Sequence, residues 1–200
     1  MALTRKSAAL FIIMAVLIGG YAVAATAAAD QDDKNASPDR AKTVRFDVAE
    51  DATRFIFDEQ SVDEDGLPAY GNEFVTQGYI YPHGTLNGTN GVKTNGEPQF
   101  PKKVIGEWTC RGWFVGDGAS TKSGPWVSTT QLYDLGDRPG EVTLVSDGAE
   151  IADVGVPIKR AITGGTGPYK VATGEASQKL LGFNKSEGVN LRFELKVGNR

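Results

Sequence analysis

The chain has 200 residues, a length that fits one ordinary domain. It is acidic, with 25 Asp and Glu against 21 Lys and Arg, and this argues against nucleic acid and anionic lipid as partners. The single cysteine, Cys110, excludes an intramolecular disulfide. The single histidine, His83, leaves too few groups for a histidine metal site or a Ser-His-Asp triad, so we expect no metal.

The N-terminal segment, residues 1–29, has a basic start, an apolar run and an Ala-Ala-Ala end, which is typical of a secretory signal peptide. An uncleaved membrane anchor is the alternative, because the apolar run could just span a bilayer. The sequence therefore predicts a secreted or extracytoplasmic protein. Residues 30–42 are polar and charged and are interpreted as a flexible linker. Residues 43–200 form the predicted folded domain.

That domain alternates strands with turns, and helical periodicity is nearly absent. Eight to nine short strands with hairpin-type turns predict an antiparallel all-β barrel or sandwich. The turns are indicated by pairs such as Asp65-Gly66, Asp147-Gly148 and Gly164-Gly165. The predicted strands are 44–48, 54–60, 74–81, 104–115, 127–135, 142–146, 156–163, 169–180 and 189–197.

The segment 82–103 is rich in Gly, Asn and Pro and has no apolar period. It is predicted to be a long surface loop, which could lie near a barrel end or be an insertion without a role.

Alternation along the strands assigns side chains to faces. Phe55, Phe57, Glu59 and Ser61 share one face of their strand. Val75, Gln77, Tyr79 and Tyr81 share a face of the next strand. Trp108, Cys110, Gly112 and Phe114 share a face of the one after, and these apolar sets are assigned to the interior.

Three of these interior positions are polar or soft: Glu59, Gln77 and Cys110. A carboxylate among aromatic side chains is costly to bury and tends to be functional, although Glu59 could equally be a solvated carboxylate on an outer face. Cys110 is interpreted first as a small core hydrophobe, since no histidine is placed to activate it as a nucleophile.

Two motifs carry a family resemblance. The segment from Ala161 to Tyr169, with Gly-Gly-Thr-Gly at its centre, resembles the late hairpin shared by allene oxide cyclases and dirigent proteins. The segment from Ile56 to Tyr70 resembles an early strand and turn of plant allene oxide cyclases. The resemblance spans about residues 53–197 and implies an eight-stranded antiparallel barrel. Its departures include Ser61 and Gln77, where the family has asparagines.

The resemblance also implies a set of site residues. Glu59 matches the family's pocket glutamate, and with Ser61 and Gln77 it forms the predicted catalytic group. The predicted substrate-binding residues line the pocket or hold a water: Phe57, Pro68, Tyr79, Trp108, Cys110 and Phe114. No cofactor is implied, and the stretch 164–167 is not a phosphate loop because it lies between strands.

These observations give two functional hypotheses. The first is a cyclase or isomerase that binds a small, apolar, reactive substrate in a dry barrel, where a fixed negative charge stabilises a developing cation. The alternative is a non-catalytic or dirigent-type barrel that steers a bound small molecule; a barrel filled only with side chains is a third option. The resemblance also implies a trimer, for which outward-facing Arg111 and Trp113 could form an interface.

Overall fold

The computed structural model describes residues 41–58, 68–116 and 126–199. The predicted signal peptide and nearly all of the predicted linker lie outside these ranges. Within them, no helix is long and apolar enough to cross a bilayer.

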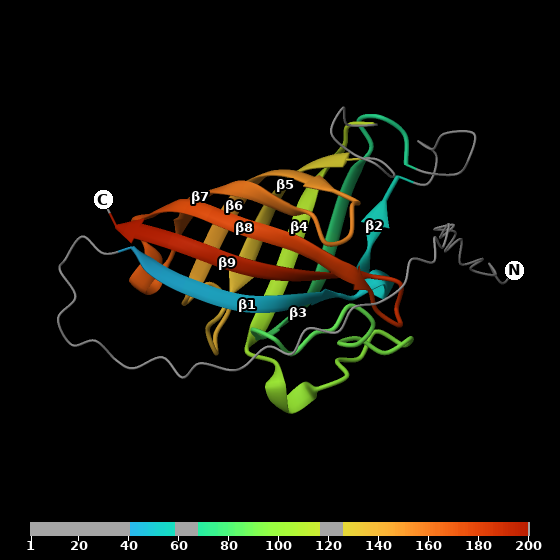
Figure 1. Ribbon diagram of the computed structural model, residues 1–200, viewed down its shortest axis with the longest axis horizontal. Helices are drawn as coiled ribbons and strands as arrows, with labels where there is room; N and C mark the ends of the chain where they lie inside the picture. The colour runs from blue at the N-terminus through green and yellow to red at the C-terminus, as the bar shows by residue number, and fades with distance from the viewer. Residues whose placement is uncertain (1–40, 59–67, 117–125, 200) are drawn as a thin grey trace, which may run out of the picture.

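The described residues fold into an all-β domain whose strands lie side by side in the order β1-β9-β8-β7-β6-β5-β4-β3-β2. An additional pairing of β1 with β3 closes the sheet, so eight strands form an antiparallel barrel (Figure 1). The short strand β2 pairs with the beginning of β3. The predicted fold class is confirmed. The strands are β1 (Lys42–Glu50), β2 (Ile56–Phe57), β3 (Glu73–Pro82), β4 (Gly106–Phe114), β5 (Trp126–Asp134), β6 (Thr143–Ile151), β7 (Pro157–Gly165), β8 (Ala172–Phe183) and β9 (Val189–Asn199).

Two predicted elements differ from the structure. Asp147 and Gly148 were predicted to form a turn, but they lie inside β6, which continues to Ile151. The predicted strand 54–60 begins instead as a single 3₁₀ turn, η1 (Ala52–Arg54), followed by the two residues of β2. The Asp51 side chain accepts a hydrogen bond from the Thr53 N–H, and this cap favours a turn over an extended strand.

The Gly-Gly-Thr-Gly hairpin joins β7 to β8, and in it only Gly167 adopts a positive φ, of 57°. Gly165 serves a different purpose, because a Cβ there would collide with the carbonyl oxygen of Thr143. The reversal is completed by a 3₁₀ turn, η3 (Gly167–Tyr169), so it is longer than a two-residue turn.

The main hydrophobic core has its largest side chains toward the end of the barrel where β1 begins and β9 ends. The rings of Phe46, Tyr133 and Phe193 lie with their centroids 5.0–5.3 Å apart, and all three are fully buried. Leu144 and Leu195 pack in the same cluster. Burial of such large side chains is the main source of stability in a domain of this size.

The segment 82–103 forms a second, smaller core on the outer wall of the barrel (Figure 1, green). Its Leu86 and Val92 pack with Ala49 and Tyr81, which point out of the barrel from β1 and β3. The segment includes the 3₁₀ turn η2 (Pro101–Lys103). It is anchored to β1 by the buried Asp47 carboxylate, which accepts the backbone N–H of Leu86. The segment was predicted to be a surface loop, and the prediction missed that it covers part of the outer wall of the barrel.

Candidate functional site

The barrel interior changes from apolar to polar toward the end where β1 stops and β9 starts. Two carboxylates, Glu50 and Glu150, lie in this half. We call this the acidic end and the opposite one the aromatic end. The alternation that places Phe46 and Val48 inside continues to Glu50, the last residue of β1.

Glu50 is almost completely buried, with 6% of its surface exposed. Its Oε1 accepts the hydroxyl of Thr76 at 2.7 Å, and its Oε2 accepts the backbone N–H of Val189 at 2.7 Å. Burial raises the pKa of Glu50 from its ordinary value of 4.5 to about 7, and the negative charges of Glu150 and Asp51 add to the rise. The two hydrogen bonds oppose it. Glu50 can therefore hold or release a proton near neutral pH.

Glu150 is the second interior carboxylate, and it is surrounded by donors. Its Oε1 accepts the hydroxyl of Thr129 at 2.6 Å and the thiol of Cys110 at 3.5 Å, while its Oε2 accepts the side-chain amide of Gln178 at 2.7 Å. The guanidinium of Arg160 lies 3.7 Å away. These contacts fix the position of the Glu150 side chain.

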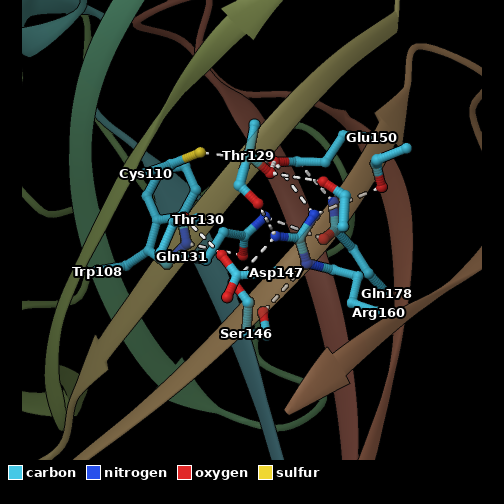
Figure 2. Close-up of polar contacts among 12 residues, drawn as sticks. Trp108, Cys110, Thr129, Thr130, Gln131, Ser146, Asp147, Glu150, Arg160 and Gln178 are labelled. Carbon is cyan, nitrogen blue, oxygen red and sulfur yellow. Dashed lines mark hydrogen bonds and ion pairs between the residues drawn. The ribbon is translucent and has the colours of Figure 1, made fainter. Parts of the chain in front are cut away.

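Arg160 is the cation at the centre of this network (Figure 2), and it is 2% exposed. Its Nε donates to the Ser146 hydroxyl at 3.1 Å, and its Nη2 donates to the carbonyl oxygens of Thr129 and Ser146 at 2.9 and 3.2 Å. Its Nη1 donates to the carbonyl of Ala149 at 3.4 Å and faces Glu150. The guanidinium thus makes four hydrogen bonds to protein acceptors, and Nη1 also faces the Glu150 carboxylate at 3.7 Å.

A layer of neutral polar side chains separates the acids from the aromatic end. Gln131 accepts hydrogen bonds from the Trp108 indole at 3.0 Å and the Tyr133 hydroxyl at 2.8 Å, and it donates to Gln178 at 3.0 Å. The Tyr133 hydroxyl also lies 2.8 Å from that of Ser146. A fully satisfied network of this kind holds each member in one orientation.

Aromatic rings from β2, β3, β4 and the residue before β2 lie on one side of the acidic end. Phe74 and Phe114 contact each other with centroids 5.2 Å apart, and Phe55 stacks on Phe74 at 5.4 Å. Phe57 packs on Phe55 at 5.7 Å. Phe114 is buried, whereas the other three rings are half-buried. We call these four residues the aromatic rim; the rim belongs to the acidic end and is distinct from the aromatic end.

Several predicted site residues lie in the interior. Trp108, Cys110 and Phe114 face inward from β4, as predicted. Burial raises the pKa of the Cys110 thiol well above its ordinary value, which agrees with a wall contact. Phe57 belongs to the aromatic rim, and Pro68 is buried.

The predicted face of β3 is wrong. Thr76, Gly78 and Ile80 point inward, while Gln77 and Tyr79 point outward. The Gln77 amide donates to the outward Thr109 hydroxyl at 3.3 Å, and the Tyr79 hydroxyl donates to the Gly96 carbonyl at 3.0 Å. The prediction failed because the segment 82–103 covers the outer tyrosines. The inward position of Gly78 requires glycine, because a Cβ there would collide with the carbonyl oxygen of Ala49.

Glu59 and Ser61 lie outside the described residues, and their roles stay predictions. Sequence reasoning missed Glu50, Glu150 and Arg160. The signal existed in the alternation of Phe46, Val48 and Glu50, but the predicted strands ended too early to include either glutamate.

The described part of the chain contains no group of three or more His, Cys, Asp or Glu side chains placed to hold a metal ion. Trp113, which was predicted to face outward, is 48% exposed, and its indole donates to Glu73 at 3.0 Å.

Comparison with known proteins identifies the fold. No protein-family model and no curated protein matches the sequence. Among solved structures, the pterocarpan synthase dirigent protein PsPTS1 superposes with a TM-score of 0.55 at 13% identity, covering 82% of this chain and 97% of that one. The chain shares the barrel fold of that dirigent protein.

Two further solved structures are similar. The pterocarpan synthase dirigent protein GePTS1 has a TM-score of 0.50 at 15% identity, and the superposition covers 85% of this chain and 96% of that chain. Pyocyanin demethylase has a TM-score of 0.50 at 18% identity and covers 78% of this chain and 99% of its own. At these identities the likeness concerns the fold, and the function must be argued from the site.

Proposed function

We propose that the barrel binds a small, largely apolar molecule at its acidic end and promotes an intramolecular cyclisation or isomerisation. The observation that carries this proposal is the pair Glu50 and Glu150, two interior carboxylates beside an aromatic rim. Glu50 is buried and its pKa is raised, and such acids cluster at functional sites. The names of the similar structures describe a synthase and a demethylase, so related barrels carry out chemistry on small molecules.

The two acids suit different tasks. Protonated Glu50 gives its proton to a substrate oxygen while a carbon–oxygen bond opens, and the electron pair of that bond goes to the oxygen. A carboxyl oxygen has a second lone pair, so Oε1 can carry this proton and still accept from Thr76. The charge of Glu150 and the faces of Phe74 and Phe114 stabilise the developing cation. Ring closure onto the cation releases a proton, which returns to Glu50.

Because nothing is added or removed, product and substrate have the same mass. The test is to purify the Glu50→Gln variant, extract any co-purified molecule, which this variant should leave unconverted, and incubate it with wild-type protein. The expected result is a new chromatographic peak of unchanged mass, which Glu50→Gln abolishes while binding is retained. A molecule that binds but is returned unchanged by the wild-type protein contradicts the cyclase proposal.

A non-catalytic or dirigent-type binding barrel is the second candidate. It is favoured by the completeness of the network around Glu150 and Arg160, in which the donors and acceptors already have protein partners. Such a wall can position a ligand without reacting with it. Export, the role of Glu59 and trimer formation remain parts of the proposal that rest on the sequence.

A further inference from the structure

The charge of the acidic end restricts what can bind there. Within residues 41–58, 68–116 and 126–199, Arg160 is the only Lys, Arg or His side chain that is buried, and its N–H groups are all directed at Ser146, Glu150 and backbone carbonyls. Four of its five N–H groups are occupied by these hydrogen bonds, and an anionic ligand at Nη1 would meet the Glu150 carboxylate, which lies 3.7 Å from that nitrogen. Glu50 and Glu150 together carry up to two negative charges against this one positive charge.

The aromatic rim adds to the same preference. The face of a phenyl ring is electronegative and attracts cations, and the rings of Phe55, Phe57 and Phe74 are only half-buried. An interior carboxylate attracts a cation more strongly than it would in water, because the local dielectric is low. Ring stacking on the rim favours a flat apolar ligand body.

The groups around Glu50 couple its proton to the charge of the ligand. Facing it are Glu150 from β6, Asp51 after β1, the Cys110 thiol from β4, the Thr76 hydroxyl from β3 and the Val189 N–H from β9. None of them is a cation. A ligand cation would therefore supply the positive charge that ionised Glu50 lacks.

Resting on the proposed function, we propose that the acidic end selects flat apolar ligands that carry a positive charge, and that their binding displaces the proton of Glu50. Such a cation carries the charge of the intermediate that forms after Glu50 has given up its proton, so it binds as a mimic of that intermediate and not as the reacting substrate, and a carboxylate such as a fatty acid is excluded. A neutral substrate reacting through a cation would be held more weakly than a stable cation of the same shape.

Calorimetric titration of the full chain with three probes of one shape tests this: 1-methylquinolinium, neutral quinoline and the anion quinoline-2-carboxylate. At pH 8 we expect the cation to bind roughly tenfold more tightly than quinoline, and the carboxylate to bind most weakly. From pH 6 to pH 8 the affinity for the cation should rise about tenfold, following the ionised fraction of a group with a pKa near 7. At pH 6, titrations in buffers of different ionisation enthalpy should show proton release.

Substitutions of Glu50 and Glu150 distinguish the contributions of the two acids to cation binding. Glu50→Gln should abolish the pH dependence and the proton release, and Glu150→Gln should weaken the cation at both pH values. Glu175→Gln is the matched control, because it removes one charge on the outer wall, where Glu175 pairs with Lys159 at 2.7 Å, and it should change nothing.

Equal or tighter binding of quinoline overturns the charge selection and leaves the proposed cyclisation to its own test, the product of unchanged mass. Failure of all three probes to bind the wild-type chain overturns the ligand class. Absence of proton release with tight cation binding overturns the coupling to Glu50.

Discussion

At the aromatic end of the barrel, the rings of Phe46, Tyr133 and Phe193 touch one another and leave the interior filled with carbon. At the acidic end, the same strands turn inward Glu50, Glu150 and a half-buried aromatic rim. The first arrangement contributes stability through burial, and the second costs stability because charge is desolvated. This cost is one ground for the proposal that the barrel binds a ligand at the acidic end.

The largest expected effect concerns the aromatic end. Phe193→Ala leaves a cavity against two rings and should lower the free energy of unfolding by about 3–5 kcal/mol. Denaturant titration measures this change. The affinity of the folded fraction for 1-methylquinolinium should be unaffected. A specific loss of affinity would place binding at the aromatic end and contradict the division between the two ends.

Arg160→Met should lower stability by a similar amount, about 3–5 kcal/mol, because it leaves Glu150 buried without its cation and removes donors from three carbonyl oxygens. Arg138→Met is the matched control, since Arg138 pairs with Glu141 in solvent. The unfolding midpoint of this variant should equal that of the wild type. Equal effects of the two substitutions would show that the contacts of Arg160 with the interior network do not stabilise the fold.

The pH dependence of stability distinguishes the ends further. The pKa of Glu50 in the folded state, about 7, lies above its ordinary value of 4.5. Between these values the folded state keeps a proton that the unfolded state has lost, so stability should fall as pH rises from 4.5 to 7 and then level off. The expected loss is on the order of 3 kcal/mol. Denaturant titrations of the wild type and Glu50→Gln should show this slope only in the wild type, and a parallel slope in the variant would assign it elsewhere.

The smallest effect is expected at the thiol. Cys110→Ala removes a buried sulfur and one weak hydrogen bond to Glu150, and it should cost about 1 kcal/mol. Conversion of the substrate should persist, because a thiol whose pKa is raised by burial is a poor nucleophile. Loss of conversion in a folded variant would mean that the thiol takes part in the chemistry.

The barrel could be predicted from turn residues and alternation, and the inward face of β4 followed from the regular spacing of Trp108, Cys110 and Phe114. The face of β3 could not, because Tyr79 and Tyr81 are covered from outside by the segment 82–103, and a covered outer face has the same composition as an inner one. Glu150 was missed for a local reason: Asp147-Gly148 has turn chemistry, but the pairing of β6 with β5 keeps it extended.

Proton exchange by Glu50 is central to the proposed binding of a ligand at the acidic end. Carbon-13 NMR of the glutamate carboxyl groups, assigned with Glu50→Gln and followed against pH, tests it most directly. The account predicts a Glu50 titration near pH 7 that moves to lower pH when 1-methylquinolinium is present. A midpoint near 4.5 that the cation leaves unchanged would contradict it.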